Sequence, residues 1–141
     1  MKTSSKVFAA GFSLINVLGV AAMAGDLTVG VTGITEHKGD ILVAVYNKKA
    51  SWLKTALLSQ KKPADNNSVS FTFKDLPEGE YAISAFQDLN QNGKLDVNSL
   101  GIPKEPYGFS NDAEGVFGPA TFDQAKFVMG TAQKAISFHL N

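Results

Sequence analysis

The sequence lacks cysteine and arginine, and only 18% of its 141 residues are charged. Without cysteine, the chain can form no disulfide bond and can carry no lipid on a cysteine. Without arginine, it lacks the forked donor that phosphate groups favour, and its 13 lysines are scattered along the chain. These absences argue against a nucleic-acid partner. They also mean that the folded state must be stabilised by a hydrophobic core.

The first 24 residues have the parts of an export signal in the usual order. Lys2 and Lys6 precede an uncharged stretch at residues 7–23, and the triplet Ala22-Met23-Ala24 has the small residues that a signal peptidase accepts. The stretch is too short and too rich in glycine and alanine to favour a membrane-spanning helix. We therefore expect a signal peptide at residues 1–24 and a periplasmic or secreted protein. A retained membrane anchor is the alternative.

Residues 25–141 have the length of one ordinary domain. Loss of residues 1–24 removes two of the 13 lysines, which leaves 11 lysines against 13 acidic residues and a formal charge of −2. No second long apolar run follows, so we expect no transmembrane segment after cleavage. A chain of this length can bury a core without help from a metal or disulfides.

Alternation of apolar and polar residues predicts β-strands in most of this domain. The segment at residues 41–46 is apolar on both faces and rich in β-branched residues, which is typical of a central strand. Three other segments place apolar side chains on one face: Leu27, Val29 and Val31; Val69, Phe71 and Phe73; and Ile136, Phe138 and Leu140. Ser70 and Thr72 are expected to face away from the core.

Two features between the strands suggest how they are connected. Trp52, Leu53, Ala56 and Leu57 have helical spacing after Ser51, a residue suited to an N-cap, so we expect one short covering helix. Pro77 and Gly79 lie between alternating segments, which predicts a β-hairpin there. Strands without regular alternation with helices favour an antiparallel β-sandwich over a βαβ fold. Residues 97–124 show no sustained periodicity and are expected to be irregular.

The segment at residues 88–96 has the oxygen spacing of a calcium loop. Asp88, Asn90, Asn92 and Asp96 occupy positions one, three, five and nine, and Lys94 at position seven would contribute its backbone carbonyl. Gly93 at position six suits the sharp turn that such loops make. The sequence therefore predicts a Ca²⁺ site built from these five residues. The alternative is an Asn-Gly turn that binds no ion.

The predicted loop differs from a complete EF-hand at its end. Position twelve should be a bidentate glutamate, but here it is Ser99. Further oxygens would have to come from water or from other side chains, for which the candidates are Asn98, Glu105, Asn111 and Asp112. With two carboxylates in the core motif, the affinity should be modest.

Three motifs, which follow one another along the chain, resemble those of a known family. They are Leu76-Pro77-x-Gly79-x-Tyr81, then the acidic loop at residues 88–96, then Leu100-Gly101-Ile102-Pro103-x-Glu105-x-Tyr107. The chain resembles the secreted bacterial domain-of-unknown-function 2141 family over nearly all of residues 25–141. The resemblance implies an exported bacterial protein and supplies no substrate.

The Leu-Pro-x-Gly-x-Tyr segment is also similar to that of transthyretin-like sandwich domains. This likeness implies a seven-stranded prealbumin-type fold. Together with the residue patterns, it leads us to expect an all-β, mainly antiparallel, Ig-like or prealbumin-like β-sandwich of about seven strands, with one short helix and a long irregular segment. A shared fold does not by itself indicate a shared function.

Little in the sequence indicates catalysis. His37 and His139 are far apart, and no Gly-x-Ser-x-Gly turn marks an activated serine. The function we expect is an exported, non-catalytic binding or structural module with an unknown ligand or envelope partner. Two alternatives stay open: a cell-envelope hydrolase that uses Asp88, Asp96 or Glu105, and a transthyretin-like binder of a small ligand.

Overall fold

A computed structural model describes residues 24–141 of the chain, so the expected signal peptide at residues 1–24 lies outside the described residues except for Ala24. The strands are β1 (Ala24–Thr32), β2 (Asp40–Tyr46), β3 (Leu58–Pro63), β4 (Val69–Pro77), β5 (Gly79–Asp88), β6 (Tyr107–Phe109), β7 (Phe127–Met129) and β8 (Lys134–His139). Three single-turn helices accompany them: η1 (Lys49–Ser51), η2 (Ser110–Asp112) and α1 (Phe122–Ala125).

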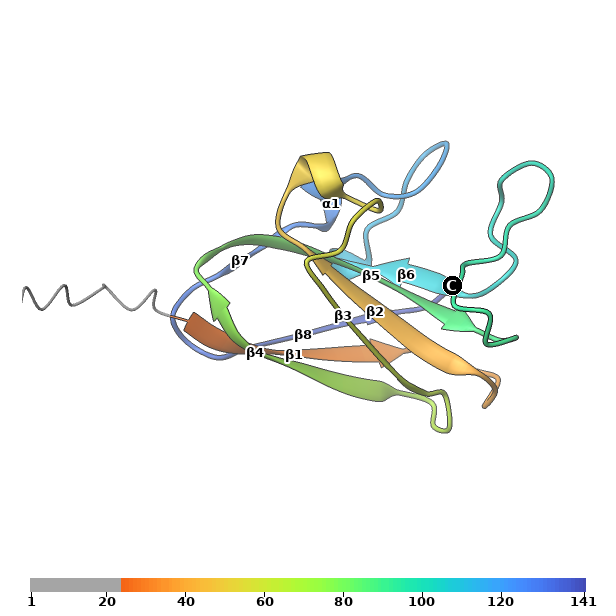
Figure 1. Cartoon of the computed structure of the whole chain (residues 1–141), viewed down its shortest axis with the longest axis horizontal. Coiled ribbons are helices and arrows are strands. Elements are labelled where there is room, and N and C mark those ends of the chain that lie inside the picture. Colours follow the sequence, from red (N-terminus) through yellow and green to blue (C-terminus); the bar gives the residue numbers. More distant parts are fainter. Residues whose placement is uncertain (1–23) are drawn as a thin grey trace, which may run out of the picture.

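The strands form two layers (Figure 1). One sheet has the order β4-β1-β8, and the other has the order β3-β2-β5-β6, with β7 pairing to the first part of β5. Every pairing between these strands is antiparallel except that of β1 with β8, which is parallel. The predicted all-β, mainly antiparallel sandwich is thus confirmed.

The main core lies between the two sheets and follows the predicted alternation. Phe71 and Phe73 of β4 are buried, whereas Ser70 and Thr72 are exposed. On β2, the side chains of residues 41, 43 and 45 face this core, and the strand lies between β3 and β5 as a central strand should. The period of two therefore identified the inward face of these strands correctly.

The expected helix around Trp52 is wrong. Only residues 49–51 form a 3-10 turn, and Leu53 adopts a positive φ of 56°, a left-handed conformation that ends any helix there. The chain then enters β3, an edge strand with mostly exposed side chains that pairs with β2. Trp52 itself is partly buried: its ring centroid lies 4.9 Å from that of Tyr46, and its indole N–H donates to the Ala120 carbonyl.

The expected hairpin at Pro77 and Gly79 is also wrong. β4 pairs with β1 in one sheet and β5 pairs with β2 in the other, so the turn carries the chain from one layer to the next. The Tyr81 hydroxyl donates to the Pro77 carbonyl at 2.7 Å, which holds the two ends of the crossover together. The same turn residues suit a hairpin and a crossover between sheets, because both require only that the chain reverse its direction.

A second apolar cluster covers part of the outer face of the β3-β2-β5-β6 sheet. Its buried members are Tyr46, Ala82, Phe109, Ala120, Phe122 and Ala125, with Trp52 and Tyr107 partly buried against them. Helix α1 contributes to this cluster, and Thr121 and Gln124 form a capping box at its start. The second half of the irregular segment is therefore anchored by its own aromatic residues.

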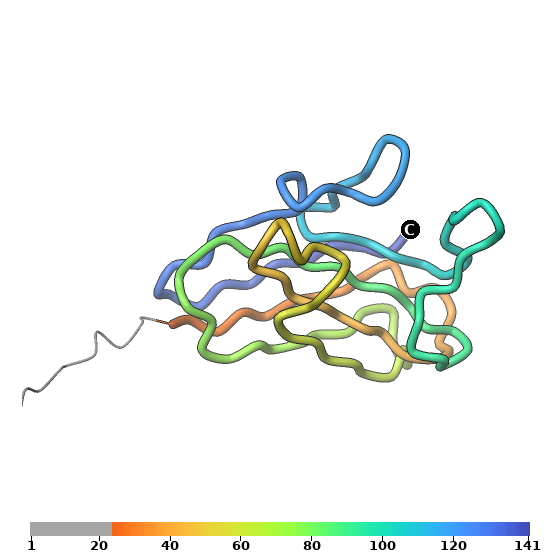
Figure 2. The backbone as a smooth tube through the Cα atoms, turned by 45° about the horizontal axis from the view of Figure 1, so that its top comes forward, coloured from red at the N-terminus to blue at the C-terminus, as the bar shows by residue number. Residues whose placement is uncertain are grey.

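Two loops project from the sandwich towards the same side (Figure 2). The first follows β5 and reaches β6, and the second connects η2 to α1. The end of the chain also lies here, because Asn141 exchanges two backbone hydrogen bonds with Tyr107. The start of β1 lies at the opposite end of the molecule (Figure 1). Within residues 24–141, no helix has the length and hydrophobicity needed to span a membrane.

Candidate functional site

The predicted calcium loop begins where β5 ends, and its first residue is firmly positioned. Asp88 is only 2% exposed and lies opposite Asp40 in the β2–β5 pairing. Gly39 has a positive φ of 68°, and a Cβ built on it would collide with the Asp88 carbonyl oxygen. The buried Gln87 side chain donates to the carbonyls of Glu36 and Lys38, which fixes this turn beside the loop.

The carboxylate of Asp88 organises the first half of the loop. One oxygen accepts from the Asn92 backbone N–H at 3.2 Å, and the other accepts from the Gly93 backbone N–H at 2.7 Å. Gly93 has a positive φ of 78°, which glycine adopts without strain. The sharp turn that the sequence predicted at position six is therefore present.

Asp96 lies where two amide side chains meet. The side-chain nitrogen of Asn90 is 2.7 Å from one carboxylate oxygen of Asp96, and that of Asn92 is 2.8 Å from the other. These hydrogen bonds hold the pKa of Asp96 below its usual value of 3.8, and the bond from Asn92 has the larger effect. The fold thus brings three of the predicted ligand side chains into contact.

The Glu105 side chain connects the two ends of the loop. It is buried, with one carboxylate oxygen accepting from the Leu89 N–H at 3.1 Å and the other from the Asp96 N–H at 3.0 Å. A backbone bond from Lys104 to the Asp96 carbonyl closes the same base. The sequence marked Glu105 as a spare oxygen donor, and here it supports the loop through backbone amides.

Other expected oxygen donors lie elsewhere. Asn98 accepts from the N–H groups of Leu100 and Ile102 and so shapes the tip of the first loop. Asn111 donates to the carbonyls of Gln124 and Lys126, and Asp112 pairs with His139 at 3.0 Å. Among residues 24–141, no three histidine, cysteine, aspartate or glutamate side chains gather as a metal-binding group. Any cation here would rely on asparagine and backbone oxygens beside Asp88 and Asp96.

The two histidines do not meet. His37 contacts Asn67 at 2.8 Å in an exposed turn, and His139 lies outward on β8 beside Asp112. The His139 side chain is half exposed, in keeping with its outward position on β8. Neither histidine contacts the loop at residues 88–96 through any hydrogen bond in the described part of the chain.

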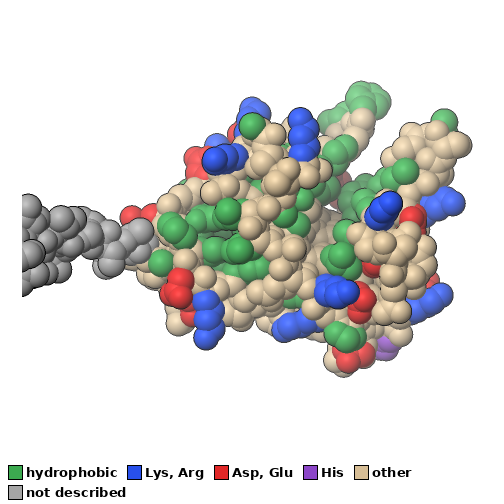
Figure 3. Space-filling model, viewed as in Figure 1, with side chains coloured by type: hydrophobic (Ala, Val, Ile, Leu, Met, Phe, Trp, Pro, Cys, Tyr) green, Lys and Arg blue, Asp and Glu red, His purple; other side chains and the backbone are tan. Residues whose placement is uncertain are grey.

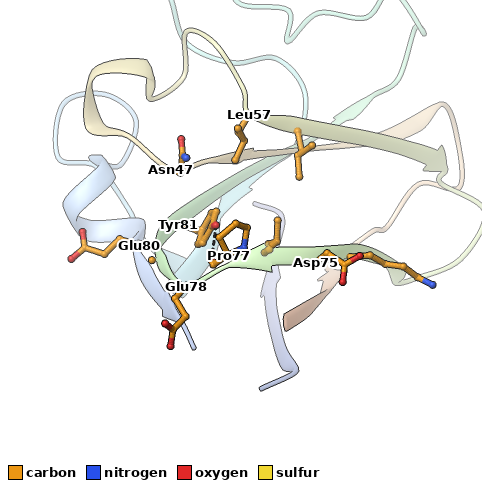
Figure 4. A pocket seen from close by; sticks show the side chains of 11 residues that line it. Asn47, Leu57, Asp75, Pro77, Glu78, Glu80 and Tyr81 are labelled. Atoms are coloured by element: carbon orange, nitrogen blue, oxygen red, sulfur yellow. Dashed lines mark hydrogen bonds between the residues drawn. The ribbon is translucent and has the colours of Figure 1, made fainter. Parts of the chain in front are cut away.

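A separate hollow opens along one edge of the sandwich, where β3 and the crossover face each other (Figure 4). It has a volume of about 570 Å³. Leu57 and Asn47 lie on one side, with Pro77 and the Tyr81 ring on the other. The Tyr81 hydroxyl is already bonded to the Pro77 carbonyl, and Glu78 and Glu80 point away from the hollow in this view. The hollow is thus the open side of the core, and the hydroxyl of the buried Tyr81 that lines it already has a partner.

The fold and the loop together define a β-sandwich protein with a polar loop, rich in aspartate and asparagine, at one end. Residues 29–137 match the family model described as "Uncharacterized protein conserved in bacteria (DUF2141)". The chain belongs to this bacterial family, as the three motifs of the sequence indicated. Comparison with curated proteins found no match, and comparison with solved structures found none either.

Proposed function

We propose that this protein is an exported, non-catalytic binding module whose loop at residues 88–96 binds Ca²⁺. The observation that carries the proposal is the contact of Asn90 and Asn92 with the Asp96 carboxylate, beside the turn that Asp88 holds. Calcium prefers such mixed carboxylate, amide and carbonyl oxygens. The Lys94 carbonyl would complete the protein ligands, and water the remaining positions.

The chemistry of Asp96 supports a cation. The amide groups of Asn92 and Asn90 favour its ionised form and so lower its pKa. A rotation of 180° about the last bond of the Asn90 or Asn92 side chain exchanges its amide nitrogen for the amide oxygen. An ion beside Asp96 would therefore meet oxygen donors from both asparagines without any change in the backbone.

The same contacts argue against the hydrolase alternative. A general acid needs a raised pKa, whereas that of Asp96 is lowered. Both oxygens of Asp88 and both oxygens of Glu105 accept hydrogen bonds from backbone N–H groups, so these carboxylates stabilise the conformation of the loop. We therefore propose binding, and not bond cleavage, as the activity.

Export is part of the proposal and is supported by the residue pattern at residues 1–24. Cleavage after Ala24, the first residue of β1, would leave Gly25 as the first residue, and Gly25 of β1 pairs with Leu76 of β4. We expect N-terminal sequencing of the protein recovered from the periplasm or medium to begin at Gly25 or within two residues of it. Recovery of a form that begins at Met1 in the membrane fraction would contradict export.

Calcium titration of the purified protein tests the loop. Only the folded chain brings these oxygens together, so free Ca²⁺ at about 100 times its dissociation constant should raise the free energy of unfolding by about 2.7 kcal/mol. Calorimetry should show one site. Mg²⁺ should stabilise much less, because it demands octahedral geometry and gives up its waters reluctantly.

Two variants of neighbouring loop residues make the test specific. Asp96→Ala removes a charged ligand from a partly exposed position and should abolish the calcium effect while the core stays folded. Lys94→Ala, the matched control, keeps the backbone carbonyl and should bind Ca²⁺ like the parent protein. No change in melting temperature at millimolar Ca²⁺ would refute the site and favour the simple Asn-Gly turn.

A further inference from the structure

An apolar cleft lies between the two loops that extend from the sandwich (Figure 3). Its volume is about 650 Å³, within the range of roughly 300–1,000 Å³ that is typical of small-molecule sites. The floor is the outer face of β5 and β6, where Phe86 lies opposite Tyr107 in the strand pairing. The walls come from residues 95–103 on one side and 115–119 on the other.

The cleft walls expose several large apolar side chains. Phe117 is fully exposed, Val116 is 83% exposed, and Leu100 is 81% exposed. Ile102 on the inner side of the first loop is 55% exposed. Large apolar side chains that gather around one hollow mark a binding surface, whereas isolated ones would need no explanation. In Figure 3, hydrophobic side chains lie between the two projecting loops, and others lie at a loop tip.

The lining indicates the chemistry of the ligand. None of the side chains that line the cleft, all within residues 24–141, is charged, although 18% of the whole sequence is. The lining includes no amide side chain either, and its only polar side chains are the hydroxyl-bearing Tyr46, Ser84 and Tyr107. A carbohydrate or an ionic ligand would lose water on binding and find few partners, which costs free energy. An apolar chain or ring loses no such bonds.

A peptide added as a further strand does not fit this cleft. The free edge that β6 would offer is already taken, because Tyr107 exchanges two backbone hydrogen bonds with Asn141. On its other side β6 pairs with β5. A bound peptide would thus leave its own backbone groups without partners against an apolar wall.

We infer that the cleft between the two loops binds an uncharged, apolar small molecule of the acyl-chain or hydrophobic-ring class. The inference names a ligand class for the proposed binding module and so rests on that proposed function, but it does not require Ca²⁺. Binding would cover Leu100, Ile102, Val116 and Phe117, and the gain would come from the removal of their surface from water.

Titration with N-phenyl-1-naphthylamine, an uncharged fluorescent probe, tests this inference on the purified protein. We expect a saturable rise in fluorescence with a stoichiometry of one probe per chain. Displacement by 1-dodecanol but not by maltose is expected from the uncharged, amide-free lining. Absence of saturable binding, or displacement by maltose, would overturn the inference.

Substitutions at exposed wall positions locate the probe without threatening the fold. Ile102→Asp and Val116→Asp should each weaken probe binding at least tenfold, because both place a charge against the ligand. Val128→Asp is the matched control, since Val128 is 63% exposed on β7 and does not line the cleft. Equal loss in all three variants, or no loss in the first two, would overturn the inference.

Two further measurements separate this ligand from other occupants. If the protein sediments with phosphatidylcholine vesicles but shows no saturable probe binding, the loop tips dock on a bilayer, which overturns the inference. If the protein self-associates and Val116→Asp abolishes the self-association, the occupant is a second copy of the chain, which also overturns it.

The probe titration is run both with Ca²⁺ and with a chelator. Probe binding in chelator supports the cleft even if the calcium proposal fails, whereas calcium binding without probe binding refutes the cleft alone.

Discussion

The main core and the loop end of this protein are stabilised by different means. Between the sheets, the largest fully buried side chains include Phe71 and Phe138, and removal of apolar surface from water provides the stability. At the loop end, three of the four buried polar or charged residues, Gln87, Asp88 and Glu105, bind backbone groups of nearby turns. Buried apolar side chains thus stabilise the two packed sheets, which we call the frame. Buried polar side chains shape the loops that form the candidate sites.

This difference predicts that changes to the frame have the largest effect. Phe71 is completely buried, so Phe71→Ala should lower the free energy of unfolding by about 3–5 kcal/mol, measured by denaturant titration. Ser70→Ala on the opposite face of the same strand should change it by less than about 0.5 kcal/mol. Equal effects of the two substitutions would mean that the strand faces the other way.

At the loop end, Glu105→Ala should have a smaller and more local effect. The change removes the acceptor of the Leu89 and Asp96 backbone N–H groups, and donors left without a partner typically cost about 1–3 kcal/mol. We also expect faster protease cleavage within residues 89–104, detected by mass spectrometry.

Glu114→Ala provides the comparison for Glu105, since Glu114 is an exposed acidic residue of the second loop. It should leave both the free energy of unfolding and the cleavage pattern close to those of the parent protein. If both variants were cleaved alike, the buried carboxylate would not be what holds the first loop.

The smallest expected effect is the titration of Asp96. Because its pKa is lower in the folded protein than the usual 3.8, the hydrogen bonds of Asn90 and Asn92 stabilise the folded state above that pH, and this contribution is lost as the pH falls through the lowered pKa. An NMR titration of the Asp96 carboxyl checks the direction. Asn92→Ala removes the largest cause and should move the pKa of Asp96 back towards 3.8; an unchanged value would contradict the loop geometry.

Much of the frame was predictable because alternation along a strand reports which side chains a sheet buries. The faces of β1, β4 and β8 and the central place of β2 follow from this pattern. The short strand β3 did not, since its edge position leaves residues 58–63 mostly exposed and removes the alternation. The helix expected at Trp52 failed because the chain turns at Leu53. Of the four apolar residues only Trp52 packs onto the outer sheet face, whereas Leu53, Ala56 and Leu57 are exposed.

For the candidate site, local spacing determined the turn of the loop, and tertiary structure determined its surroundings. The order of Asp88, Asn90, Asn92, Gly93 and Asp96 was enough to predict the turn, because its hydrogen bonds join residues two to six positions apart. Glu105 reaches the loop from nine residues beyond Asp96, and Gly39 reaches it from another strand connection. Such contacts leave no periodic trace in the sequence.

The sequence by itself determined the inward faces of the strands, the family and the acidic loop, since each rests on residues close together in the chain. Only the tertiary structure decided that β4 and β5 belong to different sheets, and that Asn111 and Asp112 lie away from the loop. It also decided that the two irregular loops flank one uncharged cleft. The physical reason is that turn residues permit a reversal without specifying the partner strand, and that a cleft exists only where distant segments pack side by side.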